Sequence, residues 1–183
     1  RKMANRIHSE FPGSHVSTDV FGSSSNDGDI YDLKALSQTD IDYIMMMTYD
    51  YTTTSYWDGK KAAPMSPLYG NAGWNTSTHL LSAANQAGSS KIIMGIPYYG
   101  VNFRVKAAEI YKYNALLSDT GSIVSVGQVN SEDYAAVYPS TKRWNDSEKS
   151  TWFPYIYSSG NEHRQVYIDD ARSLEAKYDF VNE

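Results

Sequence analysis

The sequence predicts an α/β fold in which parallel strands alternate with helices and a smaller α+β insertion follows. Three apolar segments, 15–21, 43–48 and 91–97, have the composition of strands and are separated by stretches with helical periodicity. Residues 43–48 are almost continuously apolar, as expected of a parallel strand covered on both faces. Strands that recur after roughly thirty to fifty residues, each followed by a helix, favour parallel pairing through right-handed crossovers.

An amphipathic helix is expected at the start of the chain, where Pro12 and Gly13 end the helical pattern. Its apolar positions are Met3, Ala4, Ile7 and Phe11. A polar loop follows the first strand, and Asp32 can then cap a short helix. The apolar residues that lead from this cap to the second strand are Leu33, Leu36 and Ile41.

The loop 51–74 is long for a compact domain, and loops of this length are usually functional. A helix is expected after it, capped by Asn75 or Thr76 and closed by Gly88. The expected apolar face of this helix consists of Leu80, Leu81, Ala84 and Ala87. The third strand, 91–97, completes the alternating part of the chain.

Residues 101–162 do not continue this alternation of strands and helices and are interpreted as the α+β insertion. We expect a helix around 106–117, a weak strand near 122–129 and a hairpin that turns at 159–161. A closing helix follows the hairpin, and Asp170 can cap it. The apolar face of that helix is expected to be Ala171, Leu174, Tyr178 and Val181.

Two groups of aspartates invite a functional interpretation, but a structural one is favoured for both. Asp170 is expected to act as a helix cap and Asp169 to pair with an arginine such as Arg172. The alternative places one of these two carboxylates in a cleft. Asp27 and Asp29 are expected to belong to a solvated loop, because no glutamate follows them and their neighbours are Ser, Asn and Gly.

A tyrosine and a carboxylate, Tyr49 and Asp50, come directly after the second strand. Tyr98 and Tyr99 follow the third strand in the same way. The carboxyl ends of parallel strands are where α/β proteins hold ligands, because side chains converge there while the strands stay in the core. We predict that Tyr49 and Asp50 belong to a site; the alternative is a buried tyrosine satisfied by its neighbouring aspartate.

Composition excludes several classes of protein. At 183 residues with 41% hydrophobic residues, the chain can bury one core, or one core with a small inserted lobe. No apolar stretch approaches the roughly 18 residues that a membrane helix needs, so no membrane partner is expected. The net charge of -5, without a basic stripe, argues against nucleic acid as a partner.

Aromatic composition favours carbohydrate as a ligand. The 16 tyrosines each combine a flat apolar face with a hydroxyl, which suits stacking on a sugar ring and hydrogen bonding at its rim. The alternative is that they fill half-buried strand and interface positions. The absence of cysteine excludes disulfides and thiolate metal sites, and the four scattered histidines predict no zinc site.

Three blocks of sequence, in order, resemble the signatures of glycoside hydrolase family 18, the chitinase and chitinase-like group. MTYDY, residues 47–51, is similar to the M-x-Y-D signature of the family's sixth barrel strand. GIPYYG, residues 95–100, resembles the seventh-strand signature, and VYIDDARSLEAKYDFV, residues 166–181, resembles the segment that leads from an inserted lobe into the seventh helix.

The resemblance implies a partial (β/α)8 TIM barrel that holds about strands 5 to 7. Residues 1–100 would form the partial barrel, 101–162 the insertion, and 163–183 the return strand and closing barrel helix. The missing half of the barrel, or another chain, would then cover the open strand edges. The first residue, Arg1, is not Met, so we expect the chain to begin inside a longer precursor. The resemblance favours a secreted or cell-surface location.

The implied activity is cleavage of β-1,4 bonds beside N-acetylglucosamine, with neither a metal nor an organic cofactor. The substrate's own acetamido oxygen would attack the anomeric carbon, a substrate-assisted form of retaining hydrolysis. By position, Tyr49 would hydrogen-bond the acetamido group, and Asp50 would hold sugar hydroxyls near the scissile bond. The expected substrate-binding residues are Met47 beneath the pocket, Tyr99 along the same cleft and Trp57 stacked on a neighbouring sugar.

Two departures from the family pattern bear on activity. The acid motif D-x-x-D-x-D-x-E does not occur in this sequence, so the isolated chain is expected to be inactive. Val101 stands where many members have an arginine, which puts a sugar contact there in doubt. A chitin-binding lectin without the acid, or an unrelated open-sheet sugar-binding domain, are the alternatives. The intact Met47, Tyr49 and Asp50 favour the enzyme.

Overall fold

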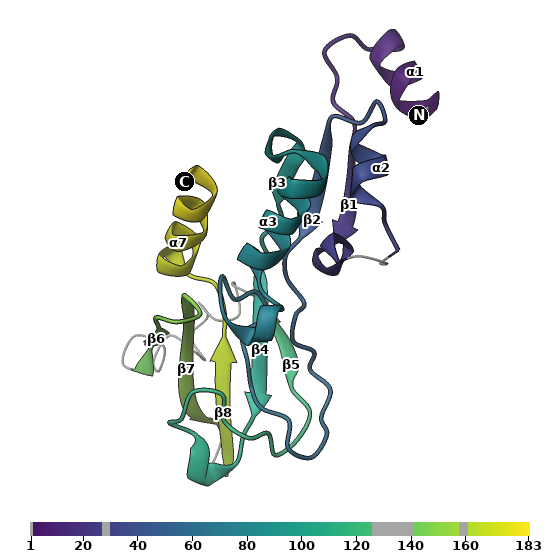
Figure 1. Cartoon of the computed structure of the whole chain (residues 1–183). Helices are drawn as coiled ribbons and strands as arrows, with labels where there is room; N and C mark the ends of the chain where they lie inside the picture. Colours follow the sequence, from purple (N-terminus) through teal and green to yellow (C-terminus); the bar gives the residue numbers. More distant parts are fainter. Residues whose placement is uncertain (1, 27–29, 126–140, 158–160) are drawn as a thin grey trace. The chain divides into compact units, whose positions relative to one another are not determined.

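The computed structural model describes residues 2–26, 30–125, 141–157 and 161–183 (Figure 1). The chain forms two compact units. The first unit consists of Arg1–Tyr49 and Asn71–Ile96, and the second of Asp50–Gly70 and Pro97–Glu183. The chain therefore passes between the units three times, and one of these passages lies between Tyr49 and Asp50.

The first unit is built on a parallel sheet with the order β1-β2-β3. Its strands are β1 (Ser17–Phe21), β2 (Tyr43–Met47) and β3 (Ile92–Met94). In the central strand β2, Ile44 and Met46 are fully buried, whereas Tyr43, Met45 and Met47 are half-buried. The three strands and their parallel pairing confirm the prediction from the apolar segments.

Three helices belong to this unit: α1 (Lys2–Glu10), α2 (Leu33–Ser37) and α3 (Thr76–Ala87). Single 3-10 turns lie at Gly22–Ser25 (η1), Asn71–Gly73 (η2) and Ser89–Lys91 (η3). The caps confirm the sequence analysis. The Asp32 carboxylate accepts a hydrogen bond from the Ala35 N–H at 2.8 Å, and Asn75 Oδ1 accepts one from the Thr78 N–H at 2.9 Å.

The predicted apolar face of α3 is wrong. Leu80 is buried as predicted, but Leu81 is exposed and Ala84 and Ala87 are only half-buried; the other buried residues of the helix are Thr76, Ser77, His79 and Ala83. Polar contacts explain this orientation, because Ser82 Oγ and Gln86 Nε2 donate hydrogen bonds to the Ser25 carbonyl at 2.8 and 2.7 Å. The face of α1 is likewise exposed: only Ala4 is buried there, while Met3 and Phe11 face solvent.

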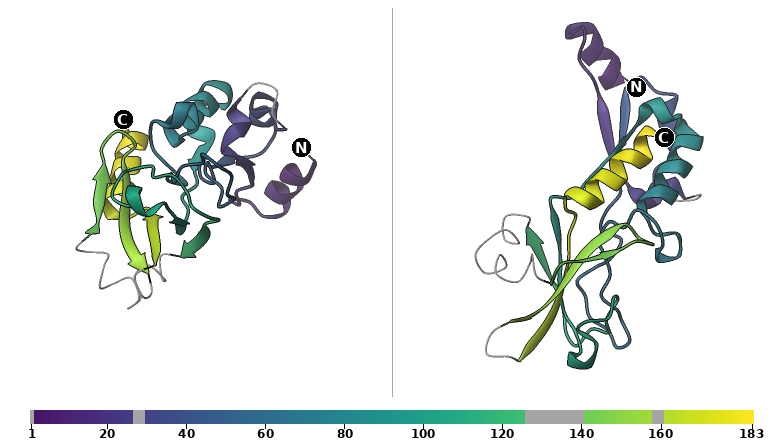
Figure 2. Two further views of the ribbon diagram at one scale, coloured as in Figure 1. Left: turned by 90° about the horizontal axis from the view of Figure 1, so that it is seen from below. Right: turned by 90° about the vertical axis from the view of Figure 1, so that its left-hand side faces the viewer.

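The second unit contains an antiparallel sheet with the order β5-β4-β8-β7-β6 (Figure 2). Its strands are β4 (Tyr99–Arg104), β5 (Ser122–Ser125), β6 (Arg143–Asn145), β7 (Ser150–Tyr157) and β8 (Glu162–Tyr167). The pairing of β7 with β8 confirms the predicted hairpin; of its predicted turn residues 159–161, the first two lie outside the described residues. Asp27 and Asp29 also lie outside them.

The helix expected around 106–117 is wrong. Only a 3-10 turn, η4 (Ala107–Glu109), forms there, and the following chain is irregular. Long-range bonds stabilise this path, since Leu117 N donates to the Lys60 carbonyl at 2.9 Å and the Lys106 N–H donates to the Leu116 carbonyl at 2.9 Å. The strand predicted near 122–129 begins at Ser122 and is described as far as Ser125.

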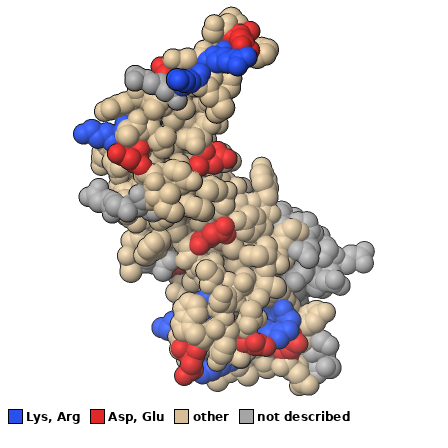
Figure 3. Space-filling view, turned by 90° about the vertical axis from the view of Figure 1, so that its right-hand side faces the viewer, with Lys and Arg blue, Asp and Glu red and all other residues tan. Residues whose placement is uncertain are grey.

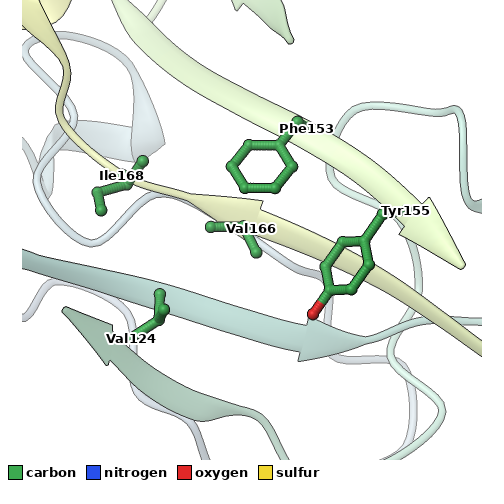
Figure 4. Packing of buried hydrophobic residues seen from close by; sticks show 5 residues of the cluster. All are labelled: Val124, Phe153, Tyr155, Val166 and Ile168. Atoms are coloured by element: carbon green, nitrogen blue, oxygen red, sulfur yellow. The ribbon is translucent and has the colours of Figure 1, made fainter. Parts of the chain in front are cut away.

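One face of this sheet packs a compact hydrophobic cluster (Figure 4). The cluster consists of Val124, Phe153, Tyr155, Val166 and Ile168. Aromatic residues cover the other face: Trp152 stacks on Tyr167 with ring centroids 6.1 Å apart, and Tyr113 meets Tyr167 edge-on at 5.6 Å. Apolar burial on both faces makes this sheet the core of the second unit.

Gly100 allows β4 and β8 to approach each other closely. A Cβ atom at this position would lie 2.1 Å from the backbone oxygen of Tyr167, so any side chain would push the two strands apart. The following residue, Val101, is fully buried and lies opposite Tyr167 in the β4–β8 ladder. Position 101 is therefore a core position in this unit.

The closing helix α7 (Ala171–Asn182) begins with a capping box, as Asp170 was predicted to provide. The Ser173 N–H donates to Asp170 Oδ1 at 3.1 Å, and the Asp170 N–H donates to Ser173 Oγ at 2.8 Å. The predicted apolar face is wrong, because Tyr178 and Val181 are 53% and 56% exposed. The buried residues of α7 are Ser173 and Lys177.

Asp169 pairs with Lys177 and not with the predicted Arg172. Lys177 is 1% exposed, and its Nζ donates to Asp169 Oδ2 at 2.5 Å and to Ser66 Oγ at 2.9 Å. Burial lowers the pKa of the Lys177 ammonium, while the Asp169 carboxylate opposes this shift. Arg172 instead lies over the indole of Trp144, 4.1 Å from its centroid.

The two units group residues 50–70 and 97–100 with the insertion. The division into a partial barrel at 1–100, an insertion at 101–162 and a return segment at 163–183 stays a prediction. Within the part of the chain that is described, no helix has the length and apolar character needed to cross a membrane.

Glu148, whose carboxyl is partly buried, joins two segments of the second unit through its side chain and its backbone. It accepts a hydrogen bond from the Tyr113 hydroxyl at 2.5 Å, and the Glu148 carbonyl accepts one from the Leu68 N–H at 3.0 Å. Burial raises the pKa of Glu148 above its ordinary value of 4.5, although the Tyr113 hydrogen bond opposes this. Folding therefore shifts the protonation equilibrium of Glu148 toward the neutral form.

We expect Glu148→Gln to increase the free energy of unfolding at pH 7 and to have a smaller effect near pH 4. A carboxyl whose pKa is raised by folding stabilises the fold below its unfolded pKa, and this contribution is lost as the pH rises through the folded pKa. Urea denaturation at a series of pH values measures the difference. The exposed Glu175→Gln is the matched control, and a Glu148→Gln effect that does not change with pH would contradict this account.

Candidate functional site

The end of β2 fixes Tyr49 within the first unit. Thr48, which is fully buried, donates from its Oγ1 to the Gly95 carbonyl at 2.9 Å. A Cβ atom on Gly95 would lie 2.7 Å from the Met46 backbone oxygen and 3.2 Å from Cε1 of Tyr49. The glycine therefore leaves room for the tyrosine ring beside the backbone that follows β3. Met47 is half-buried as the last residue of β2.

Asp50 and Tyr99 lie together within the second unit. The Tyr99 hydroxyl donates to the two carboxylate oxygens of Asp50, at 3.0 Å for Oδ1 and 3.1 Å for Oδ2. The Asp50 side chain is exposed, so its remaining lone pairs are accessible to a ligand. The contact joins residues that are 49 positions apart and that both belong to the sequence signatures described above.

The backbone of Asp50 has a φ of 60°, in the left-handed region. Aspartate tolerates this region better than most residues, but the conformation still costs free energy. Strained residues of this kind cluster at binding and catalytic sites, where the surrounding structure imposes them. The backbone geometry therefore adds a second, independent indication that Asp50 has a functional role.

Trp57 lies in a loop that is bonded to the rest of the second unit. The Ala62 N–H donates to the Ala115 carbonyl at 2.8 Å, and the Gly121 N–H donates to the Thr54 carbonyl at 2.8 Å. The side chain of Trp57 is 56% exposed, and the ammonium of Lys60 lies 4.1 Å from its ring centroid. Lys60 itself is 7% exposed, and burial lowers its pKa.

The second unit also has a small hollow beside Tyr99. Pro97, Tyr99, Tyr167 and Asp169 are among the residues that line it. The carboxylate of Asp169 is paired with the buried Lys177, so this end of the hollow is fixed by an ion pair. Two of the lining residues thus have fixed partners, because Tyr99 is hydrogen-bonded to Asp50 and Asp169 is paired with a lysine.

Sequence reasoning predicted Met47, Tyr49, Asp50, Trp57 and Tyr99 as site residues. The structure brings Asp50 and Tyr99 into contact, and it places Met47 and Tyr49 at the end of β2. Trp57 lies on a separate loop, where its ring contacts Lys60.

Sequence reasoning missed Lys60 and Lys177. Lys177 lies eight residues after Asp169, and this spacing does not make two side chains neighbours on a helix. No pattern in the sequence around Lys60 indicated its contacts.

A comparison with protein families identifies the chain. The model of the glycosyl hydrolases family 18 matches residues 11–183. The chain belongs to glycosyl hydrolases family 18.

A curated relative of this family 18 chain is probable chitinase 10 of Drosophila melanogaster. It is 31% identical over 114 residues, which are 59% of this chain and 5% of the relative.

Solved structures show the same fold. The class V chitinase from Nicotiana tobaccum is 18% identical, with a TM-score of 0.80 over 100% of this chain and 53% of that one. The chitinase-like agglutinin from Robinia pseudoacacia is also 18% identical, with a TM-score of 0.73 over 98% of this chain and 50% of that one. The family 18 chain thus has an α/β fold similar to that of barrel chitinases, and it spans about half the length of these structures.

Proposed function

We propose that this family 18 chain is part of a glycoside hydrolase that cleaves β-1,4 bonds in polymers of N-acetylglucosamine. The observation that carries the proposal is the exposed Asp50, held in a left-handed backbone conformation and hydrogen-bonded by Tyr99 directly after the M-x-Y-D strand. A carboxylate and a phenol at the end of a barrel strand can hold the hydroxyl and amide groups of a sugar. In this proposal the chain forms a partial (β/α)8 barrel, with about strands 5 to 7.

The proposed mechanism is substrate-assisted retaining hydrolysis. Tyr49 donates a hydrogen bond to the acetamido group, whose oxygen attacks the anomeric carbon as the glycosidic bond breaks. Asp50 holds the sugar in the geometry that this attack needs. The leaving oxygen takes its proton from an acid outside this chain, because the sequence has no D-x-x-D-x-D-x-E motif. Water then opens the cyclic intermediate at the same carbon, with retention.

The charge distribution supports a neutral polysaccharide as the ligand. On the face shown in Figure 3, the charged side chains of the described residues occur in small groups, some mixed and some only acidic, and uncharged residues form most of the surface. Such a surface recognises a ligand through hydroxyl, amide and aromatic groups. Two solved relatives in fold are complexes with N-acetylglucosamine oligomers: a class V chitinase variant with NAG4 and a Cycas revoluta chitinase with (GlcNAc)3.

A second candidate is a chitin-binding lectin without catalytic acid. The structural likeness to a chitinase-like agglutinin favours it, together with the absence of the acid motif from this sequence. The M-x-Y-D residues Met47, Tyr49 and Asp50 favour the enzyme, because all three of these signature residues are intact. Family membership excludes the alternative of an unrelated open-sheet domain.

Hydrolysis of chitohexaose by the full-length protein tests the proposal. We expect turnover with the β-anomer as the first product, detected by proton NMR before mutarotation, since attack by the acetamido group leads to retention. Residues 1–183 alone are expected to be inactive. Binding without cleavage by the full-length protein would favour the lectin, and α-anomeric product or the absence of binding would overturn the proposed function.

A further inference from the structure

The ammonium of Lys60 is fully satisfied within its own loop. Its Nζ donates to the Thr53 carbonyl at 2.6 Å, to Thr53 Oγ1 at 3.0 Å and to the Ser55 carbonyl at 2.6 Å. An ammonium group has three N–H donors, so these acceptors use all of them. Lys60 is therefore poorly suited to bind a ligand directly, and its role lies in the structure of the loop.

The same ammonium lies against one face of the Trp57 indole. The distance of 4.1 Å from Nζ to the ring centroid is within the range of a cation–π contact. The Lys60 N–H also donates to the Trp57 carbonyl at 3.1 Å, so backbone and side chain both connect the two residues. With Lys60 against its ring, Trp57 remains 56% exposed to solvent.

The loop that carries this pair is anchored to a neighbouring segment. The Leu117 N–H donates to the Lys60 carbonyl at 2.9 Å, and the Lys61–Leu116 bridge lies beside it. Lys60 thus links the Trp57 indole to backbone that is hydrogen-bonded elsewhere in the second unit. An exposed aromatic ring that is already ordered loses less conformational entropy when a ligand stacks on it.

We propose that Lys60 is a positioning residue that holds the Trp57 indole as a preformed platform for one sugar ring of an N-acetylglucosamine oligomer. The exposed part of the indole offers the flat apolar surface that the C–H face of a pyranose needs. The sugar ligand in this inference rests on the proposed function. The ordering of Trp57 by Lys60 does not depend on that function. The platform extends the site along the polymer and favours longer oligomers over shorter ones.

The first test needs no ligand. In the full-length protein, the Nε1–H resonance of Trp57 is assigned by its loss in Trp57→Phe, and its shift and linewidth are compared between variants. Lys60→Met is expected to shift and broaden this resonance, because the ring loses its cation and the loop loses three hydrogen bonds. The adjacent exposed Lys61→Met is the matched control and should leave it unchanged. An unchanged resonance in Lys60→Met overturns the inference.

The second test measures binding and kinetics with chitotetraose and chitohexaose. Lys60→Met is expected to weaken chitohexaose binding about three- to tenfold, the size of the cost of ordering one side chain, and to raise KM with kcat nearly constant. In a Trp57→Ala background the same substitution should have no further effect, since Lys60 acts through the indole. If Lys60→Met weakens binding in the Trp57→Ala background as much as in the original protein, the inference is overturned.

Two outcomes separate this inference from the proposed function. If the unsubstituted protein binds no oligomer, the proposed function fails, while the indole resonance still reports whether Lys60 orders Trp57. If Trp57→Ala weakens binding and Lys60→Met does not, Trp57 contacts the oligomer but Lys60 does not position it, and the inference is overturned. Lys60→Gln keeps two N–H donors and is measured alongside, so that a folding defect in the Met variant does not decide the result.

Discussion

Tyr49→Phe in the full-length protein is expected to lower kcat for chitohexaose about 10²- to 10³-fold, the loss seen when one donor to a developing charge is removed. The phenylalanine ring keeps the packing beside Gly95, so only the hydroxyl that steadies the acetamido oxygen is lost. Asp50→Asn is expected to lower kcat by a similar factor, because the amide no longer offers a charged acceptor to the sugar and to Tyr99. Initial rates at saturating substrate, with circular dichroism to confirm folding, measure both effects.

Matched controls exist for both substitutions. Tyr43→Phe removes a hydroxyl from a half-buried tyrosine at the start of the same strand, and Asp58→Asn neutralises an exposed aspartate in the loop after Asp50. Both should retain turnover within about twofold, since surface and peripheral changes rarely exceed about 0.5 kcal/mol. Unchanged kcat in Tyr49→Phe and Asp50→Asn would return both residues to a structural role.

Lys177→Met is expected to lower the free energy of unfolding by about 3–5 kcal/mol, the cost of removing one partner from a buried ion pair. Methionine fills most of the volume of the lysine stem, so the loss comes from the Asp169 carboxylate, which would remain without its cation. Ser66 Oγ would lose its contact with Nζ as well. Urea denaturation followed by tryptophan fluorescence measures the change.

The double variant Asp169→Asn/Lys177→Met separates charge from packing. Replacing both ions by neutral groups of similar size is often neutral, so we expect the double variant to recover to within about 1 kcal/mol of the original protein. Lys112→Met, at an exposed lysine that pairs with Glu109 at 3.5 Å, should change stability by less than about 0.5 kcal/mol. A double variant as unstable as Lys177→Met would show that the loss comes from packing.

Features that depend on neighbouring residues were predictable from the sequence. Asp32, Asn75 and Asp170 were all assigned as helix caps, and each accepts the expected backbone hydrogen bond. The parallel strands were predictable because a strand buried on both faces has a continuous apolar run. These signals are local, so no knowledge of distant partners is needed.

Features that depend on distant partners were not predictable. The segment 106–117 has helical spacing of apolar residues, but hydrogen bonds to Lys60 and Arg104 hold its end in an irregular path. The apolar face of α7 was wrongly chosen because a lysine, buried by Asp169 and Ser66, occupies the inner side. Sequence spacing carries no information on such pairs.

The candidate site falls between these cases. The family resemblance placed Tyr99 along the same cleft as Asp50, and in the structure the Tyr99 hydroxyl donates to the Asp50 carboxylate. The left-handed backbone at Asp50 and the lysine behind Trp57 had no sequence signal. Both arise from the path of the loop 51–74, and loop conformation depends on contacts with the rest of the unit.

The interleaved path of the chain limits how this fold can be dissected. The chain enters the second unit at Asp50, leaves after Gly70 and returns at Pro97, so neither unit is a continuous segment. A truncation at Ile96 would retain the loop that carries Trp57 but discard 115–121, to which that loop is hydrogen-bonded. Isolating the first unit requires an internal excision that joins Tyr49 to Asn71. Any such excision severs the peptide bond between the two residues to which the chemistry is assigned.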